Sequence, residues 1–177
     1  MSASPDARGS FLWGPLTPFA LAVAVAAAAV DQAAKLWLLH AVDLPARGIV
    51  RLTPFLDLVL TWNTGISWGL FRQEGPLGQG ALLALKAFAV VLLWIWLSRT
   101  TSRLAALSLG LIIGGAVGNA IDRFAYGAVV DFVLFHINTA SFSFNWYVFN
   151  LADVAIVAGV IGLLFETLIG TGAAKAP

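Results

Sequence analysis

The sequence has no cysteine and little charge, and both absences narrow what the protein can be. Without cysteine there are no disulfides, thiolate metal ligands or cysteine nucleophiles, and the redox compartment stays open. Only 11% of the 177 residues are charged, against about 25% in a typical soluble domain. The net charge of +1 is too small to indicate a nucleic-acid partner.

Histidine is scarce as well. His40 and His136 do not form a His-Glu-x-x-His helix, which excludes the zinc peptidases that use that motif. Residues 65–69, Gly-Ile-Ser-Trp-Gly, match the Gly-x-Ser-x-Gly motif of serine hydrolases. That motif belongs on a strand-to-helix turn of a soluble α/β sheet, so we interpret the match at Ser67 as chance. No metal and no cofactor are expected.

Apolar residues are abundant. They make up 60% of the chain, and the mean hydropathy is +0.90. Four apolar runs can cross a bilayer, at residues 16–39, 81–97, 104–120 and 148–169. We therefore expect one membrane domain over residues 1–177, an all-α bundle of four transmembrane helices. A cleaved signal peptide is the alternative for the first run, because residues 26–29 are alanines that resemble a cleavage site.

Two polar segments, residues 40–80 and 121–147, fall on the same side of this predicted bundle. Within the first, the chain up to residue 63 alternates, with Leu58 and Trp62 on its apolar face, which is typical of a half-buried strand. Residues 129–137 suit a second strand. Basic residues are denser in the short segments on the other side, so we expect cytoplasmic termini and extracytoplasmic polar segments.

Charged residues inside apolar runs are the strongest functional signal. An unpaired charge at mid-bilayer costs about 2.5–3.5 kcal/mol, so charges kept there usually face the bundle interior or an aqueous cavity. Asp31 and Lys35 are four residues apart and can pair, either as a surface charge pair or as part of a site. Lys86 interrupts the second run, and the plain interpretation is an ammonium that reaches the membrane surface.

Asp131 and Asp153 are expected at the same membrane surface, after the third run and at the start of the fourth. Two carboxylates held about 3 Å apart share one proton. The ionised one can take a proton from water while the protonated one polarises a carbonyl. The alternative is that both merely pair with Arg123 and Lys35, and composition and spacing leave both possibilities open. Asp122 is expected to be structural, paired with Arg123 or capping the loop.

Two other functions also fit an apolar chain with carboxylates. One is a small proton or ion pathway, since intramembrane carboxylates relay protons. The other is a non-enzymatic assembly factor. A conduction path needs polar residues through the depth of the membrane, whereas here, Lys86 apart, they gather at one end.

Four motifs, in this order, resemble the lipoprotein signal peptidase family, the signal peptidase II enzymes of bacteria. They are Asp31-Gln32 with Lys35, Asn63-Thr64-Gly65 with Trp68, residues 114–123 with 127–132, and residues 149–153, Phe-Asn-Leu-Ala-Asp. The resemblance covers about residues 16–169. The sequence departs from the family pattern at Ala34, where Ser or Thr is common, and at Ile66-Ser67.

The resemblance implies an aspartyl endopeptidase of the bacterial inner membrane, which cleaves diacylglyceryl-modified prolipoproteins before the lipidated cysteine. It implies Asp131 and Asp153 as the catalytic pair, and a small extracytoplasmic β-rich cradle near residues 49–71. The residues implied to bind substrate or support the site are Asp31, Lys35, Asn63, Gly65, Asn119, Asp122, Arg123, Asn150 and Ala152. Membrane lipid is a further implied partner, globomycin-type peptides are implied inhibitors, and we expect a monomer.

Overall fold

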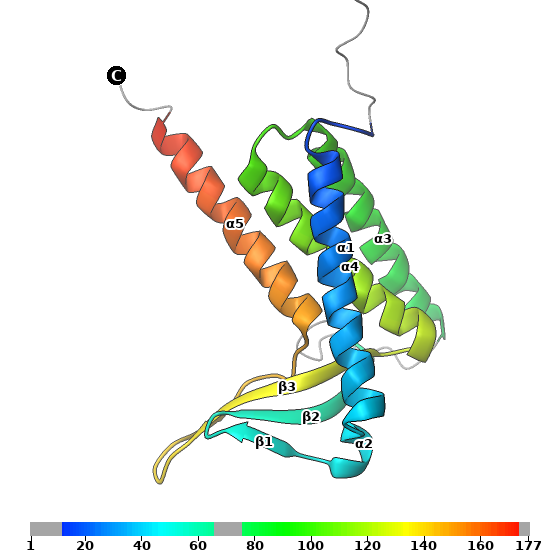
Figure 1. Ribbon diagram of the computed structural model, residues 1–177, viewed down its shortest axis with the longest axis vertical. Helices are drawn as coiled ribbons and strands as arrows, with labels where there is room; N and C mark the ends of the chain where they lie inside the picture. The colour runs from blue at the N-terminus through cyan, green and yellow to red at the C-terminus, as the bar shows by residue number, and fades with distance from the viewer. Residues whose placement is uncertain (1–11, 66–75, 174–177) are drawn as a thin grey trace, which may run out of the picture.

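The computed structural model describes residues 12–65 and 76–173 (Figure 1). Ser67 and Trp68 lie outside the described residues. The elements are α1 (Thr17–Leu36), the π-helical turn η1 (Trp37–Ala41), α2 (Leu44–Arg47), β1 (Val50–Thr53), β2 (Leu56–Asn63), α3 (Pro76–Arg99), α4 (Arg103–Tyr126), β3 (Val129–Asn138), β4 (Ser143–Asn145) and α5 (Leu151–Ala173).

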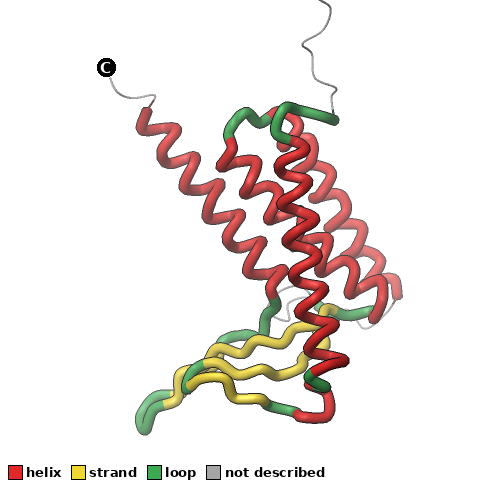
Figure 2. The backbone as a smooth tube through the Cα atoms, in the orientation of Figure 1, coloured by secondary structure: helices red, strands yellow, loops and turns green. Residues whose placement is uncertain are grey.

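The long helices form one body, and the strands form a sheet at one end of it (Figures 1 and 2). α4 is the central helix, and α1, α3 and α5 all pack against it. α1 begins and α5 ends at the end of the bundle that faces away from the sheet (Figure 1). Among the described residues, three segments are long and apolar enough to cross a membrane: Thr17–Ala41, Arg103–Tyr126 and Leu151–Leu168. They match the first, third and fourth predicted runs, and the second run lies within α3.

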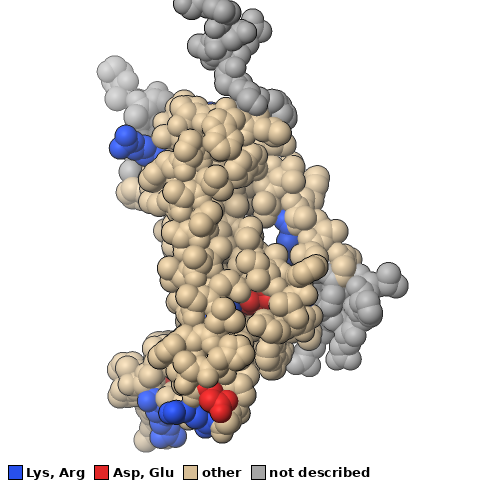
Figure 3. All heavy atoms as spheres, turned by 45° about the vertical axis from the view of Figure 1, so that its right-hand side comes forward, with Lys and Arg blue, Asp and Glu red and all other residues tan. Residues whose placement is uncertain are grey.

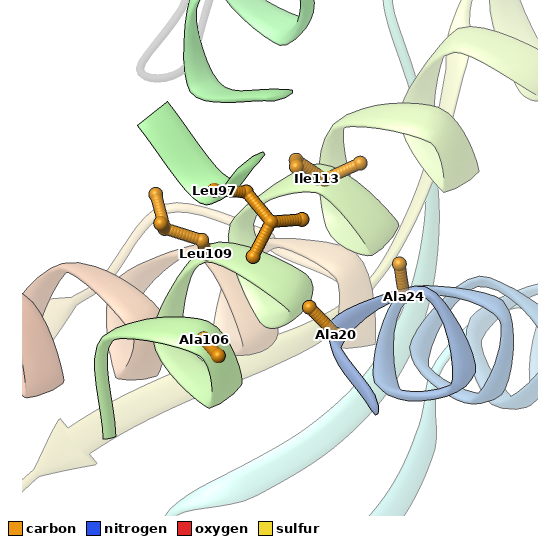
Figure 4. Close-up of a cluster of buried hydrophobic side chains, with 6 residues drawn as sticks. All are labelled: Ala20, Ala24, Leu97, Ala106, Leu109 and Ile113. Atoms are coloured by element: carbon orange, nitrogen blue, oxygen red, sulfur yellow. The ribbon is translucent and has the colours of Figure 1, made fainter. Parts of the chain in front are cut away.

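Small side chains allow α1 to approach α4 closely. Ala20 and Ala24 of α1 belong to a buried cluster with residues of α3 and α4 (Figure 4). At Gly114 of α4, an added Cβ would lie 2.9 Å from the Cα of Ala24. That distance is below normal contact, so a side chain there would push the two helices apart. This pair of helices later brings the charged residues of α1 and α4 into contact.

The sheet is antiparallel, in the order β1-β2-β3-β4. The predicted alternating strand up to residue 63 is in fact two strands, because the chain turns at Pro54, which cannot donate a ladder hydrogen bond. The predicted faces of β2 are wrong in part. Asp57 is buried and lies 3.1 Å from His136 Nε2, whereas Trp62 is 46% exposed. The register shift between Leu58 and Thr61 breaks the alternation.

Two predicted boundaries also need correction. Residues 121–126, predicted as loop, are the last turns of α4, which ends at Tyr126 and is capped by Gly127. Gly127 has φ +72° and donates its N–H to the carbonyl of Arg123, a left-handed cap that favours glycine. The fourth helix begins at Leu151 and not at residue 148, because the backbone of Phe149 pairs with Val133 of β3. Both changes place polar side chains at helix ends beside the sheet.

Candidate active site

Asp131 and Asp153 come together where the sheet meets the helices. Asp131 lies on β3, and Asp153 lies in the first turn of α5. Both line one open cavity of about 630 Å³, together with Asn63 of β2. The rest of the lining is mostly apolar or aromatic and comes from residues 146–149 and from α5. Two carboxylates at the wall of an apolar cavity are placed to act on a ligand inside it.

Asp131 is held by amide side chains. It is only 2% exposed, and its two carboxylate oxygens accept from different residues. Asn150 Nδ2 donates to Oδ1 at 2.7 Å, and Asn63 Nδ2 donates to Oδ2 at 3.0 Å. The strand register explains the second contact, because Asn63 pairs with Val129, two residues before Asp131. Side chains at such diagonal positions lie on the same face of a sheet.

Asp153 is fixed by a reciprocal cap at the start of α5. Its backbone N–H donates to Asn150 Oδ1 at 3.0 Å, and its carboxylate accepts from the backbone N–H of Asn150 at 3.2 Å. This is the geometry of a capping box. Asn119 Nδ2 of α4 donates to the other carboxylate oxygen at 2.9 Å. Asp153 is half-buried, and its place in the first helical turn favours a negative charge.

The environment of Asp131 changes its acidity. Burial raises the pKa of Asp131 to about 6, and the nearby charge of Asp153 adds to the rise, while the amide hydrogen bonds of Asn63 and Asn150 oppose it. A carboxyl group with a pKa near neutrality can hold a proton or release it during a reaction. Asp131 therefore has the acidity that acid–base chemistry requires.

A second group of charged residues lies beside this pair, and here two carboxylates pair with one cation. Lys35 Nζ is 2.7 Å from Asp31 and 2.6 Å from Asp122, and all three side chains are at most 2% exposed. The predicted Asp31–Lys35 pair is confirmed. The expected pairing of Asp122 with Arg123 is not what the structure has, because Lys35 of the adjacent helix reaches Asp122. The expected loop cap is present, since the backbone N–H of Val130 donates to Asp122 at 3.1 Å.

Close helix packing shapes this ion cluster, which we define as Asp31, Lys35 and Asp122. At Gly118 an added Cβ would lie 2.8 Å from Asp31 Oδ2, so only glycine leaves room for the carboxylate. The other oxygen of Asp31 accepts the backbone N–H of Ala152 at 2.9 Å. The ion cluster therefore joins three helices, α1, α4 and the start of α5.

Asn119 links the ion cluster to the two site aspartates. Its Oδ1 accepts from Lys35 at 3.3 Å and from Asn150 Nδ2 at 3.0 Å, while its Nδ2 donates to Asp153. Gln32, which follows Asp31 in the first motif and had no predicted role, donates to Asp122 at 2.8 Å. A polar side chain inside an apolar run was the signal that could have identified it.

The remaining predicted site residues hold the end of β2. Arg123 Nη2 donates to the carbonyl of Gly65 at 2.6 Å, and the N–H of Gly65 donates to Asn63 Oδ1 at 3.0 Å. Arg123 is buried. These contacts fix Asn63, which in turn contacts Asp131. The structure thus brings all eleven predicted residues into one connected region.

The comparisons with known proteins agree with this geometry. A family model described as signal peptidase (SPase) II matches residues 23–169. A lipoprotein signal peptidase of Nitrobacter hamburgensis is 65% identical over 157 residues, which are 89% of this chain and 96% of the relative. A second lipoprotein signal peptidase, of Rhodopseudomonas palustris strain TIE-1, is 60% identical over 164 residues, which are 92% of this chain and 100% of the relative.

Solved structures have the same fold. One bacterial membrane enzyme superposes with a TM-score of 0.70 at 24% identity, over 90% of this chain and 93% of the other. Another bacterial membrane enzyme gives a TM-score of 0.64 at 25% identity, over 85% of this chain and 93% of the other. The family match spans most of the chain and includes both site aspartates. The chain therefore belongs to the signal peptidase II family.

Proposed function

We propose that Asp131 and Asp153 are the catalytic pair with which this signal peptidase II removes signal peptides from prolipoproteins. One observation carries the assignment. Both carboxylates open onto one cavity and are held by amide groups, whereas Asp31 and Asp122 are buried and both paired with Lys35. A carboxylate that shares a buried ammonium is committed to holding helices together, whereas a carboxylate at the cavity wall can reach a bound substrate.

The chemistry needs one proton on the pair. The ionised carboxylate takes a proton from water, and the water oxygen attacks the scissile carbonyl carbon. The protonated carboxyl donates its proton to the carbonyl oxygen, and collapse of the tetrahedral intermediate breaks the C–N bond as the amine takes up a proton. Burial supports Asp131 as the carrier of the proton, and the helix start supports Asp153 as the base.

The lining of the cavity is evidence for a substrate that carries a lipid. Its lining is mostly apolar, from Trp146, Val154, Val157 and Ile161 among others. Such a surface suits the acyl chains of a diacylglyceryl group and the apolar end of a signal peptide. We assign cleavage to the bond before the lipidated cysteine, and we expect globomycin-type peptides to compete for the same cavity and membrane lipid to surround it.

The other predicted residues act as supports. In this proposal Asn63, Asn119 and Asn150 orient the two carboxylates. Gly65 and Arg123 fix the end of β2. The ion cluster and Ala152 hold α1, α4 and α5 in register.

We further assign the whole chain to a single domain in the bacterial inner membrane, acting as a monomer. α3 is the fourth transmembrane helix in this assignment, and the sheet forms the extracytoplasmic cradle. Both termini are cytoplasmic, because basic residues are denser at that end. The cysteine-free chain allows a direct test with Ala46→Cys near the sheet and Thr101→Cys between α3 and α4. Labelling of both from the same side of intact cells would contradict this topology.

The test of the catalytic pair is an assay of purified protein with a lipidated prolipoprotein. Asp153→Asn keeps the size of the side chain but removes the base, so turnover should fall at least about 10²-fold. Asp43→Asn is the matched control. It makes the same chemical change at an exposed residue with φ 55°, a conformation that Asn tolerates, and should cleave normally. Near wild-type cleavage by folded Asp153→Asn would overturn the assignment.

A further inference from the structure

One edge of the sheet leads to the site aspartates. β1 and β4 are the outer strands. After β4 the chain runs along β3 and into α5 (Figure 1), and on this way residues 146–149 line the cavity that Asp131 and Asp153 share. Residues 141–147 are exposed. The outer edge of β4 is therefore open to a ligand that also enters the cavity.

The strand register shows which backbone groups of β4 point outward. His136 of β3 donates its N–H to the carbonyl of Phe55, so its backbone faces the β2 side. Asn145 is the β4 partner of His136. In an antiparallel ladder, two partner residues either bond to each other or both turn their backbone groups away. The N–H and C=O of Asn145 therefore point away from β3, and those of Ser143, two residues earlier, do so as well.

This edge lacks the features that usually block strand addition. Natural edge strands carry charges, above all Lys, or Pro, and these keep other chains from pairing with them. Residues 139–149 contain no charged residue and no Pro. The β1 edge differs, because Arg51 lies on it and Pro54 follows it, and Figure 3 shows basic side chains gathered at the sheet end of the molecule. An unprotected edge beside the site indicates a surface kept open for an extended chain.

Chain direction identifies which side of the scissile bond fits this edge. β4 runs toward the site, from Ser143 to Asn145, and the chain continues to Asp153. Every pair of strands in the sheet is antiparallel. A strand added in the same manner runs from the site outward, which is the direction of the segment after the scissile bond. The apolar signal peptide before the bond can satisfy its own backbone groups as a helix in the membrane, so it needs no strand partner.

We propose that β4 binds the prolipoprotein segment that follows the lipidated cysteine, as an added antiparallel strand. The inference rests on the cleavage proposed above and concerns a further part of the same substrate. Main-chain hydrogen bonds to a sheet edge give affinity without requiring particular side chains, so one edge can serve different mature sequences. His136, opposite Asn145, lies five residues after Asp131 on β3, or about 17 Å along the strand. A chain of about five residues after the scissile bond spans that distance.

The experiment compares two lipidated substrates that end about two and about eight residues after the modified cysteine. The longer one reaches Asn145, and its edge hydrogen bonds should raise kcat/KM about tenfold over the shorter one. Asn145→Pro removes the outward N–H, a change that edge strands tolerate, and should reduce this ratio severalfold. Asn145→Ala keeps the N–H and should keep the ratio. Melting temperatures of both variants check that they fold.

A second measurement uses the longer substrate with single N-methylated backbone amides. The N–H groups of a strand point alternately to its two sides. Methylation near the fifth residue should therefore lower kcat/KM at every second position and leave it nearly unchanged at the positions between. This alternation distinguishes an added strand from a segment that binds through its side chains.

Several outcomes would overturn the strand addition. Equal kcat/KM for both substrate lengths would do so, as would methylation effects that do not alternate. An equal loss of the ratio in Asn145→Ala would indicate a side-chain contact instead. A dimer in detergent that Asn145→Pro disrupts, with an unchanged ratio, would assign the edge to a second copy of the chain. The catalytic pair is tested separately, because cleavage of the shorter substrate must still depend on Asp131 and Asp153.

Discussion

The two groups of carboxylates in this protein differ in what holds them. In the ion cluster, Lys35 Nζ lies within 2.8 Å of a carboxylate oxygen of Asp31 and of Asp122, and all three side chains are at most 2% exposed. The site aspartates are held by amides and open onto a cavity. The carboxylates of the ion cluster bind a protein cation and are closed off from the cavity, whereas the site aspartates are held by neutral donors and remain accessible to a ligand. Burial alone therefore does not distinguish a structural aspartate from a reactive one.

The largest effect should come from breaking the ion cluster. Lys35→Met leaves Asp31 and Asp122 buried without a counter-charge, and removing one partner of a buried pair costs about 3–5 kcal/mol. Thermal unfolding in detergent should show a large loss of stability, with poor yield. The triple change Asp31→Asn, Lys35→Met and Asp122→Asn removes all three charges and should recover much of that stability. A Lys35→Met protein as stable as wild type would mean that the two carboxylates do not need Lys35 as a buried counter-charge.

A smaller effect should appear in the pH dependence of stability at Asp131. Because its pKa is raised from 3.8 to about 6, the folded state keeps a proton between these pH values that the unfolded state has released. Ionisation of Asp131 thus costs stability as the pH rises through this window, by an amount on the order of 2–3 kcal/mol. Asn at position 131 cannot ionise, so the stability of Asp131→Asn relative to wild type should increase as the pH rises from 4 to 7.

The measurement is the melting temperature of both proteins across that pH range. Below about pH 4 the carboxyl is protonated in both states, and the difference between variant and wild type should level off. A difference that does not change with pH would show that Asp131 has an ordinary acidity in the folded protein.

The smallest expected effect is on the amide that holds Asp131. Asn63→Ala removes the 3.0 Å hydrogen bond to Oδ2. A hydrogen bond to a charged group contributes about 1.5–3 kcal/mol, so kcat/KM should fall by about 10- to 100-fold. The acid limb of the pH profile of kcat/KM should also move to higher pH, because the Asn63 amide favours the ionised form of Asp131. Asn138→Ala, on the exposed end of β3, is the control and should change neither quantity.

The sequence predicted three apolar spans that the structure has, and it singled out residues that the structure brings together, because these signals are local. Apolar runs and the charges at their ends can both be identified from the order of residues along the chain. The partner of Asp122 was not, because Lys35 comes from a different helix and reaches it only when Gly118 allows close approach. The burial of Asp57 likewise depends on a register shift between two strands, which no single segment encodes.

The comparison of the two groups is tested most directly by one pair of variants, Asp131→Asn and Asp122→Asn, each assayed for cleavage per folded molecule and for melting temperature. Both lose one buried carboxylate. The account predicts that Asp131→Asn stays folded but loses at least about 10²-fold in turnover, while Asp122→Asn melts at a lower temperature yet still cleaves. A folded Asp131→Asn protein that cleaves at a near wild-type rate would contradict the account, as would a stable Asp122→Asn protein that is inactive.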